Sequence, residues 1–179
     1  MGLDAVMIVI SVEDTFGIKI SDPEAVNLRT PDQLAAFVAE RVQALPDDLC
    51  ITQQTYYRLR RGFRTAIPAL APDLRLEARL DQFLHRDQWP QVWTAVRNGA
   101  DAPEWPETVP WPGLLKPGPR TIRDLVWHLA IALTPPRGQR PERWSKQQVA
   151  HTVRRIILEE SGVSPAFDSK RTFADLGIS

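Results

Sequence analysis

The stretch LDAVMIVISVEDTFGIKI, residues 3–20, decides the fold class of this chain. Its apolar residues recur at the three- and four-residue spacing of an α-helix, and they occupy more than one face. One face would carry Leu3, Val6, Met7 and Ile10. The other would carry Ile8, Val9, Val12 and Phe16. Gly17 follows at once, and glycine readily adopts the left-handed conformation that ends a helix. The stretch therefore predicts a helix over residues 3–16 with one buried and one exposed apolar face.

Capping residues and prolines mark further helices on both sides of this stretch. A Ser or Thr precedes each of four helical segments, and two of these segments have proline in their first turn. The four capping residues are Ser21, Thr30, Thr121 and Ser145. The helices after the last three should run to about residues 44, 133 and 160. Amphipathic spacing predicts helices over 53–66 and 88–97 and a short one within 74–84. Because no segment alternates at the period of a strand, we expect an all-α protein.

Composition excludes several classes of protein. Apolar residues make up 43% and charged residues 25% of the 179 residues, as in an ordinary globular protein. The longest nearly uncharged apolar run, 5–12, is too short to cross a bilayer, and the first residues lack the basic start of a secretory signal. Cys50 is the only cysteine, and three histidines lie far apart. We therefore expect a cytoplasmic protein with no disulfide, no metal site and no catalytic site.

Two short patterns occur twice. Residues 53–54 and 60–61 read Gln-Gln and Arg-Arg, as do 147–148 and 154–155, at an offset of 94. Arg-Thr occurs at 29–30 and at 120–121, at an offset of 91. The two patterns have the same order in both copies only if the end of the chain is joined to its start. This indicates two bundles related by circular permutation, one formed by 1–45 with 140–179 and the other by 50–135.

The permuted order implies that the two chain ends meet. The last helix should pack on residues 3–16 and 34–42 through the apolar face Val149, Val153, Ile156 and Ile157. If the bundle closes within one chain, Met1 and Ser179 should lie close together. The alternative is a domain-swapped homodimer, in which one chain's last helix completes the bundle of its partner.

The joined sequence resembles an acyl carrier protein. Residues 175–177, Asp-Leu-Gly, match the end of the long loop of that family, and Leu3-Asp4 match the residues after its attachment serine. Residues 12–20, 22–24 and 29–31 match the end of helix two, helix three and the start of helix four. The resemblance covers about 80 residues and implies a small four-helix bundle. The middle of the chain would be a degenerate second copy.

The resemblance fails at the residue that carries the family's chemistry. Carrier proteins attach a phosphopantetheine arm to a serine at the start of helix two. Counted back from Phe16, that position falls on Gly2. Counted forward from residues 175–177, it falls on Met1. Neither residue has a hydroxyl group. We therefore expect no phosphopantetheine. An alternative is a functional carrier that uses Ser179, which lies one or two positions away.

Two surfaces are candidates for partner binding. The first is the apolar face Leu3, Val6, Met7 and Ile10, which corresponds to the surface that partner enzymes read in the resembling family; the alternative is that the middle of the chain covers it. The second is the basic segment with Arg58, Arg60, Arg61 and Arg64, which could dock an acidic protein, bind nucleic acid through phosphates or simply face solvent. Residues 1–49 carry a net charge of −6 (three basic, nine acidic) and residues 50–100 one of +4 (eight basic, four acidic). We favour a protein partner, such as an enzyme of lipid or secondary metabolism, over nucleic acid and over a membrane.

Overall fold

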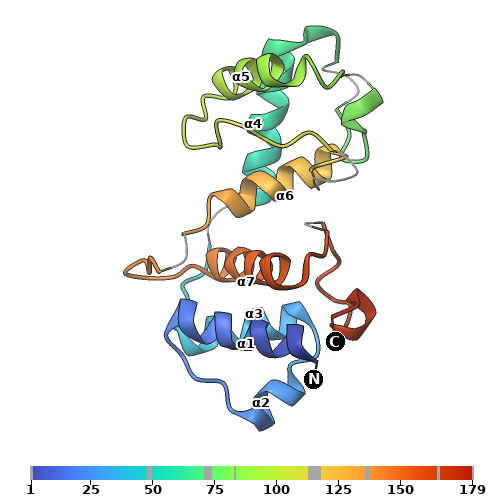
Figure 1. Ribbon diagram of the computed structural model, residues 1–179. Helices are drawn as coiled ribbons and strands as arrows, with labels where there is room; N and C mark the ends of the chain where they lie inside the picture. The colour runs from blue at the N-terminus through green and yellow to red at the C-terminus, as the bar shows by residue number, and fades with distance from the viewer. Residues whose placement is uncertain are drawn as a thin grey trace. The chain divides into compact units, whose positions relative to one another are not determined.

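The computed structural model describes residues 2–47, 50–70, 74–82, 84–112, 118–135, 138–164 and 166–178. Throughout these ranges the regular structure is helical (Figure 1), and two isolated backbone bridges are the only β-type pairs among them. This confirms the prediction of an all-α protein.

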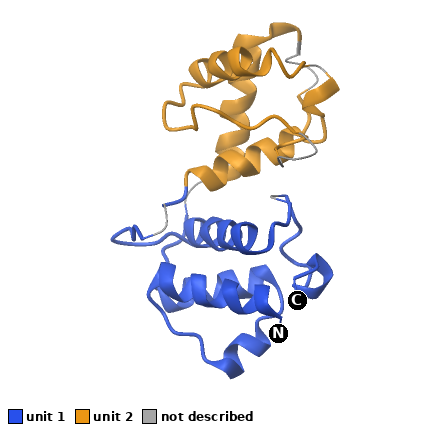
Figure 2. Ribbon diagram, viewed as in Figure 1, with its two compact units in different colours: residues 1–48, 134–179 blue, residues 49–133 orange. Residues whose placement is uncertain are grey.

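The chain divides into two compact units (Figure 2). Unit 1 consists of Met1–Asp48 with Thr134–Ser179, and unit 2 consists of Leu49–Leu133. Unit 1 is thus built from both ends of the chain, whereas unit 2 is continuous. The division expected from the sequence, 1–45 with 140–179 and 50–135, differs from this one by at most six residues at any boundary (140 against 134).

Unit 1 contains α1 (Leu3–Phe16), α2 (Asp22–Asn27), α3 (Pro31–Arg41), α7 (Lys146–Ser161) and the 3-10 turn η3 (Ala174–Leu176). In the structure α7 packs against α1 and α3 of the same chain. The predicted contact face of α7 is fully buried, at 0–1% exposure: Val149, Val153, Ile156 and Ile157. These side chains share one apolar core with residues from α1 and α3, namely Ile8, Val12, Phe16, Leu34 and Val38.

Local chemistry fixes where α1 ends. Gly17 has φ +69°, in the left-handed region, and its amide donates to the carbonyl of Glu13 at 2.8 Å. Arg140 donates to the carbonyls of Thr15 at 3.0 Å and Asp14 at 2.7 Å, so a cation satisfies acceptors left open in the last turn. The segment before α7 is thereby tied to the end of α1.

The other caps of unit 1 follow the prediction. In Thr30–Gln33 and Ser145–Gln148 the side chain of each residue accepts the backbone amide of the other, and the carboxylate of Glu24 accepts both the amide and the hydroxyl of Ser21. However, α3 ends at Arg41 rather than near residue 44. Gln43 turns into the left-handed region at φ +52°, and the amide of Ala44 bonds back to Ala39 at 2.8 Å. This closing bond is typical of a helix C-terminus.

Unit 2 contains α4 (Ile51–Ala66), α5 (Trp89–Gly99), α6 (Ile122–Ala132) and the 3-10 turns η1 (Pro68–Leu70) and η2 (Leu80–Gln82). Its irregular, proline-rich segment is held by indole groups of α5. Trp89 donates to the carbonyl of Val109 at 2.7 Å and Trp93 to that of Pro106 at 2.9 Å, while Trp93 stacks on Trp105. Large apolar rings with one polar edge can both pack such a segment and satisfy its carbonyl groups.

The short helix expected within 74–84 is only the turn η2 in the described part of that range. Backbone groups there bond to the start of α6 instead of along a helix. The amide of Leu80 donates to the carbonyl of Arg120 and the amide of Ile122 to that of Ala78, each at 2.9 Å. Because Ala78 and Leu80 use backbone groups to bond to the start of α6, the helical pattern of this segment does not propagate.

The same local arrangement occurs in unit 1. There the amide of Phe173 donates to the carbonyl of Arg29 at 2.9 Å, and Arg29 directly precedes the capping residue of α3. Arg120 holds the corresponding position before the cap of α6. The turns η3 and η2 lie 94 residues apart (174 − 80), the offset of the repeated Gln-Gln and Arg-Arg pairs.

Candidate functional site on the first helix

Helix α1 has an apolar outer face and an apolar inner face. The outer face is exposed at all four predicted positions: Leu3 77%, Val6 38%, Met7 40% and Ile10 43%. We call these four residues the α1 stripe. On the inner face Ile8, Val12 and Phe16 are at most 5% exposed, and Val9 is half-buried. The sequence-based assignment of the two faces therefore agrees with the exposure, apart from the partial exposure of Val9.

Two carboxylates border the α1 stripe. Asp4 is half-buried next to Leu3, and Asp14 is exposed one turn after Ile10. Glu13, the neighbour of Asp14, is directed to the 18–20 loop instead. Its carboxylate accepts the amide of Ile20 at 2.8 Å and forms an ion pair with Lys19.

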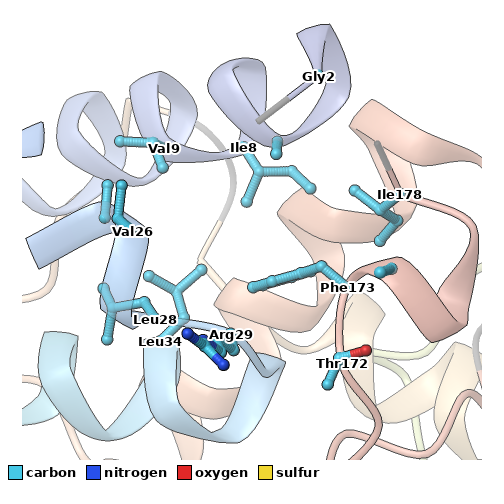
Figure 3. Close-up of a pocket in the computed structure, with 13 residues that line it drawn as sticks. Gly2, Ile8, Val9, Val26, Leu28, Arg29, Leu34, Thr172, Phe173 and Ile178 are labelled. Atoms are coloured by element: carbon cyan, nitrogen blue, oxygen red, sulfur yellow. The ribbon is translucent and has the colours of Figure 1, made fainter.

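A cavity of about 600 Å³ lies along the inner side of the N-terminal half of α1 (Figure 3). Its walls come from α1, α2, the start of α3 and the C-terminal segment around η3. Thirteen residues line it: Gly2, Ala5, Ile8, Val9, Ala25, Val26, Leu28, Arg29, Leu34, Thr172, Phe173, Ala174 and Ile178. Figure 3 shows the ring of Phe173 extending from the C-terminal segment toward Leu34. The volume of the cavity falls within the range of roughly 300–1,000 Å³ that is usual for small-molecule sites.

Only two polar side chains line this cavity, and they differ in what they can do. The Thr172 hydroxyl donates to Asp175 at 2.7 Å, and the Thr172 amide bonds to the same carboxylate at 3.2 Å. These two hydrogen bonds lower the pKa of Asp175 below its ordinary value. Thr172 is therefore committed to capping η3.

Among the described residues that line the cavity, Arg29 alone is charged. Its backbone is held on both sides, by Gln33 at 2.9 Å and by Phe173 at 2.9 Å. Its side chain is exposed, and its guanidinium group forms no hydrogen bond or ion pair within the described part of the chain. The backbone of Arg29 is thus held in place, and its guanidinium group is a cation at the edge of the apolar cavity.

Sequence reasoning missed this cavity. Its lining combines residues from 2–34 with residues from 172–178. The sequence indicated this combination only through the expectation that the two chain ends meet. That expectation names Met1 and Ser179, which lie outside the described residues. Their neighbours Gly2 and Ile178 line the same cavity, and Ile178 is 3% exposed.

Two of the four candidate arginines of α4 are engaged within unit 2. Arg58 pairs with the carboxylate of Glu104 and lies over the ring of Trp105, 5.4 Å from its centre. This contact lowers the pKa of Glu104. Arg61 donates to the carbonyl of Ala100 at 2.6 Å. Both arginines therefore help to hold the segment that follows α5.

The remaining two arginines lie on the same side of α4 as Arg61. Arg60 is half-buried and Arg64 is exposed. Successive residues of a helix turn by about 100°, so Arg60, Arg61 and Arg64 fall within an arc of about 100°, and Arg58 points away from Arg60. Arg61 and Arg64 share an exposed face with Tyr57, which is 57% exposed. Arg58 is thus a structural contact, whereas Arg60, Arg61 and Arg64 lie on one basic side of α4.

The described residues also bear on metal sites and on membrane spans. No group of three or more His, Cys, Asp or Glu side chains in that part of the chain could hold a metal ion. No helix there combines the length and apolar character that a membrane span requires.

Comparison with protein-family models, with curated proteins and with solved structures finds no match. The resemblance to acyl carrier proteins accordingly rests on the residues quoted for it.

Proposed function

We propose that this protein is a non-catalytic, acyl-carrier-protein-like interaction protein that lacks a phosphopantetheine arm and binds a partner protein through the α1 stripe. The observation that carries the proposal is the exposure of four large apolar side chains, 38–77%, on one face of a helix whose other face is core. Contiguous exposed apolar residues with a polar rim are characteristic of interaction sites. Methionine at the centre suits such a surface, because its flexible thioether adapts to a partner.

Three observations support the carrier-like part of the proposal. Both ends of the chain contribute to one unit. If the C-terminus were joined to the N-terminus, α7, α1, α2 and α3 would follow one another in the order of the four helices of an acyl carrier protein. The caps of α3 and α6 are both threonines with reciprocal bonds to residues 33 and 124. The turns η3 and η2 make equivalent backbone bonds to the residue that precedes each cap.

The absence of catalysis is supported by what the cavity lining contains. Among the described residues of the lining there is no carboxylate, histidine, cysteine or lysine, and the hydroxyl of Thr172 is bonded to Asp175. Gly2, one of the lining residues, holds the position where the resemblance would place the arm, and it has no side chain to modify. Nothing in this lining can act as a nucleophile paired with a base.

Site-specific photocrosslinking tests the partner surface. A photoreactive amino acid is placed at Met7, or at Leu45 as a control that is 47% exposed in the same unit but off the stripe. We expect one reproducible protein adduct from position 7, lost when Ile10→Glu is added, and none from position 45. Equal adducts from both positions would refute the α1 stripe as a binding surface.

Intact-mass measurement tests the missing arm. The purified chain is incubated with a phosphopantetheinyl transferase and coenzyme A, beside a carrier protein that the enzyme modifies. We expect modification of the carrier protein alone. A gain of one arm by this chain, abolished by Ser179→Ala, would establish the alternative of a functional carrier.

A further inference from the structure

Helix α4 has one face in the core of unit 2 and one face open to solvent. On the inner face Leu59 and Phe63 are fully buried. On the outer face Tyr57 is 57% exposed, and Arg61 and Arg64 are exposed beside it. At about 100° per residue, Arg61 lies about 40° to one side of Tyr57 and Arg64 about 20° to the other. The outer face therefore carries an aromatic ring between two guanidinium groups.

The outer face contains neither a carboxylate nor an aliphatic side chain. The residues of α4 that fall within about 60° of Tyr57 are basic, amide-bearing or aromatic. We call them the α4 basic face: Gln53, Gln54, Tyr57, Arg60, Arg61 and Arg64. A ligand of this face must be anionic, because no acidic residue of α4 offsets the three cations.

The corresponding face of unit 1 is covered. On the offset of 94, His151 and Arg154 of α7 correspond to Tyr57 and Arg60. His151 is 6% and Arg154 is 7% exposed. Arg154 donates to the carbonyl of Phe167 at 2.9 Å, and its guanidinium lies 4.1 Å from the centre of that ring. The segment after α7 thus contacts this face in unit 1, whereas Tyr57 remains exposed in unit 2.

The guanidinium groups of the α4 basic face retain donors for a ligand. Arg64 forms no hydrogen bond or ion pair within the described part of the chain. Arg61 is oriented by one bond, from Nη2 to the carbonyl of Ala100 at 2.6 Å, and its side chain stays exposed. A guanidinium has five N–H donors in a planar fork that matches a phosphate or a carboxylate.

The composition of the face selects between these two anions. The buried centre of a protein–protein interface is apolar and poor in charged residues, whereas interfaces with nucleic acid are polar and strongly basic. The exposed ring of Tyr57 adds a surface on which a nucleic-acid base can stack. Only a base outside a duplex has a free face for such stacking. The charge balance of the whole sequence favours a protein partner, but this face has the composition of a nucleic-acid surface.

We propose that the α4 basic face binds single-stranded nucleic acid, with phosphates on Arg60, Arg61 and Arg64 and one base stacked on Tyr57. From Tyr57 to Arg64 the helix rises by about 10 Å, a length that two or three nucleotides span. These contacts use phosphates and the flat side of a base, which DNA and RNA share, so they read no sequence. The proposal is independent of the α1 stripe, which lies in the other unit.

Fluorescence anisotropy of the full chain at low salt tests the proposal. The labelled probes are a twelve-nucleotide oligothymidine, an oligouridine and an abasic strand of the same length, and a peptide of twelve glutamates. We expect oligothymidine to bind at least fivefold more tightly than the abasic strand, which has the same phosphates but no base to stack. Three phosphate contacts predict a slope of log affinity against log salt of about −2. Comparison with oligouridine shows whether the sugar matters.

Matched variants separate stacking from charge. Tyr57→Ala should remove the preference for oligothymidine over the abasic strand, and Tyr57→Phe should retain it. Arg64→Gln should reduce the magnitude of the salt slope by about 0.7, whereas Arg143→Gln, at an exposed arginine of unit 1, should leave it unchanged. Circular dichroism confirms the fold of each variant. In the unaltered chain, oligothymidine should shift the amide resonances of Gln54 and Tyr57 and not those of α7.

Four outcomes would overturn the proposal. They are no binding of either oligonucleotide at low salt, equal affinity for oligothymidine and the abasic strand, a salt slope that Arg64→Gln leaves unchanged, and amide shifts confined to residues outside α4. Tighter binding of the glutamate peptide than of both oligonucleotides, lost in Arg64→Gln, would assign the α4 basic face to an acidic protein instead.

Discussion

Ile8 and Ile10 provide a matched test of the two faces of α1. They are the same residue type, two positions apart on one helix, but Ile8 is 1% exposed and Ile10 is 43% exposed. Substitution of either by alanine removes the same three carbon atoms and brings the same small gain in helix propensity, a few tenths of a kcal/mol. Any difference between the two variants therefore measures burial.

The magnitude follows from the buried surface. Removal of three buried carbon groups at about 0.8 kcal/mol each costs about 2.4 kcal/mol, to which a cavity term is added. Because Ile8 already borders open volume, this added term is small, and we expect Ile8→Ala to destabilise unit 1 by about 2–3 kcal/mol. At Ile10 only part of the side chain is removed from water, so Ile10→Ala should cost about 1 kcal/mol or less.

Amide hydrogen exchange of α7 reports this cost, since α7 packs on α1 and its slowest amides exchange when unit 1 opens. We expect exchange about thirtyfold faster or more in Ile8→Ala and about fivefold faster in Ile10→Ala, because 1.4 kcal/mol corresponds to a factor of ten. Equal acceleration in both variants, or a larger effect in Ile10→Ala, would refute the assignment of the inner and outer faces.

Three further predictions follow from single contacts. Met7→Glu should change the free energy of unfolding, measured by urea titration, by less than about 1 kcal/mol, since Met7 is 40% exposed; a loss above 2 kcal/mol would show that the α1 stripe is covered. Arg140→Ala should cost about 1–2 kcal/mol by the same titration, because two carbonyls of the last turn of α1 lose their donor, whereas Arg143→Ala should cost little. The carboxyl carbon of Asp175 should titrate below the ordinary range of aspartate in an NMR pH titration, and Thr172→Val should raise that pKa. The Thr172–Asp175 contact is therefore present above the ordinary pKa and lost as pH falls through the lowered one, and an unchanged midpoint in the variant would contradict it.

The sequence by itself determined the elements that depend on local chemistry. The start of α7 follows from Ser145 and Gln148, whose side chains bond reciprocally, and the end of α1 follows from the left-handed freedom of Gly17. Helical spacing places Ile8 and Met7 on different faces of α1. These features need only residues within a few positions of each other.

Only the tertiary structure decided where the α4 arginines and the C-terminal segment lie. Arg58 belongs to a basic amphipathic sequence, yet its charge pairs with Glu104, 46 positions along the chain. The cavity lining combines Arg29 with Phe173, whose backbones are joined by one hydrogen bond across 144 positions (173 − 29). Local pattern carries no information about such pairs, because each residue's neighbours in space are set by how distant helices pack and not by its own preference.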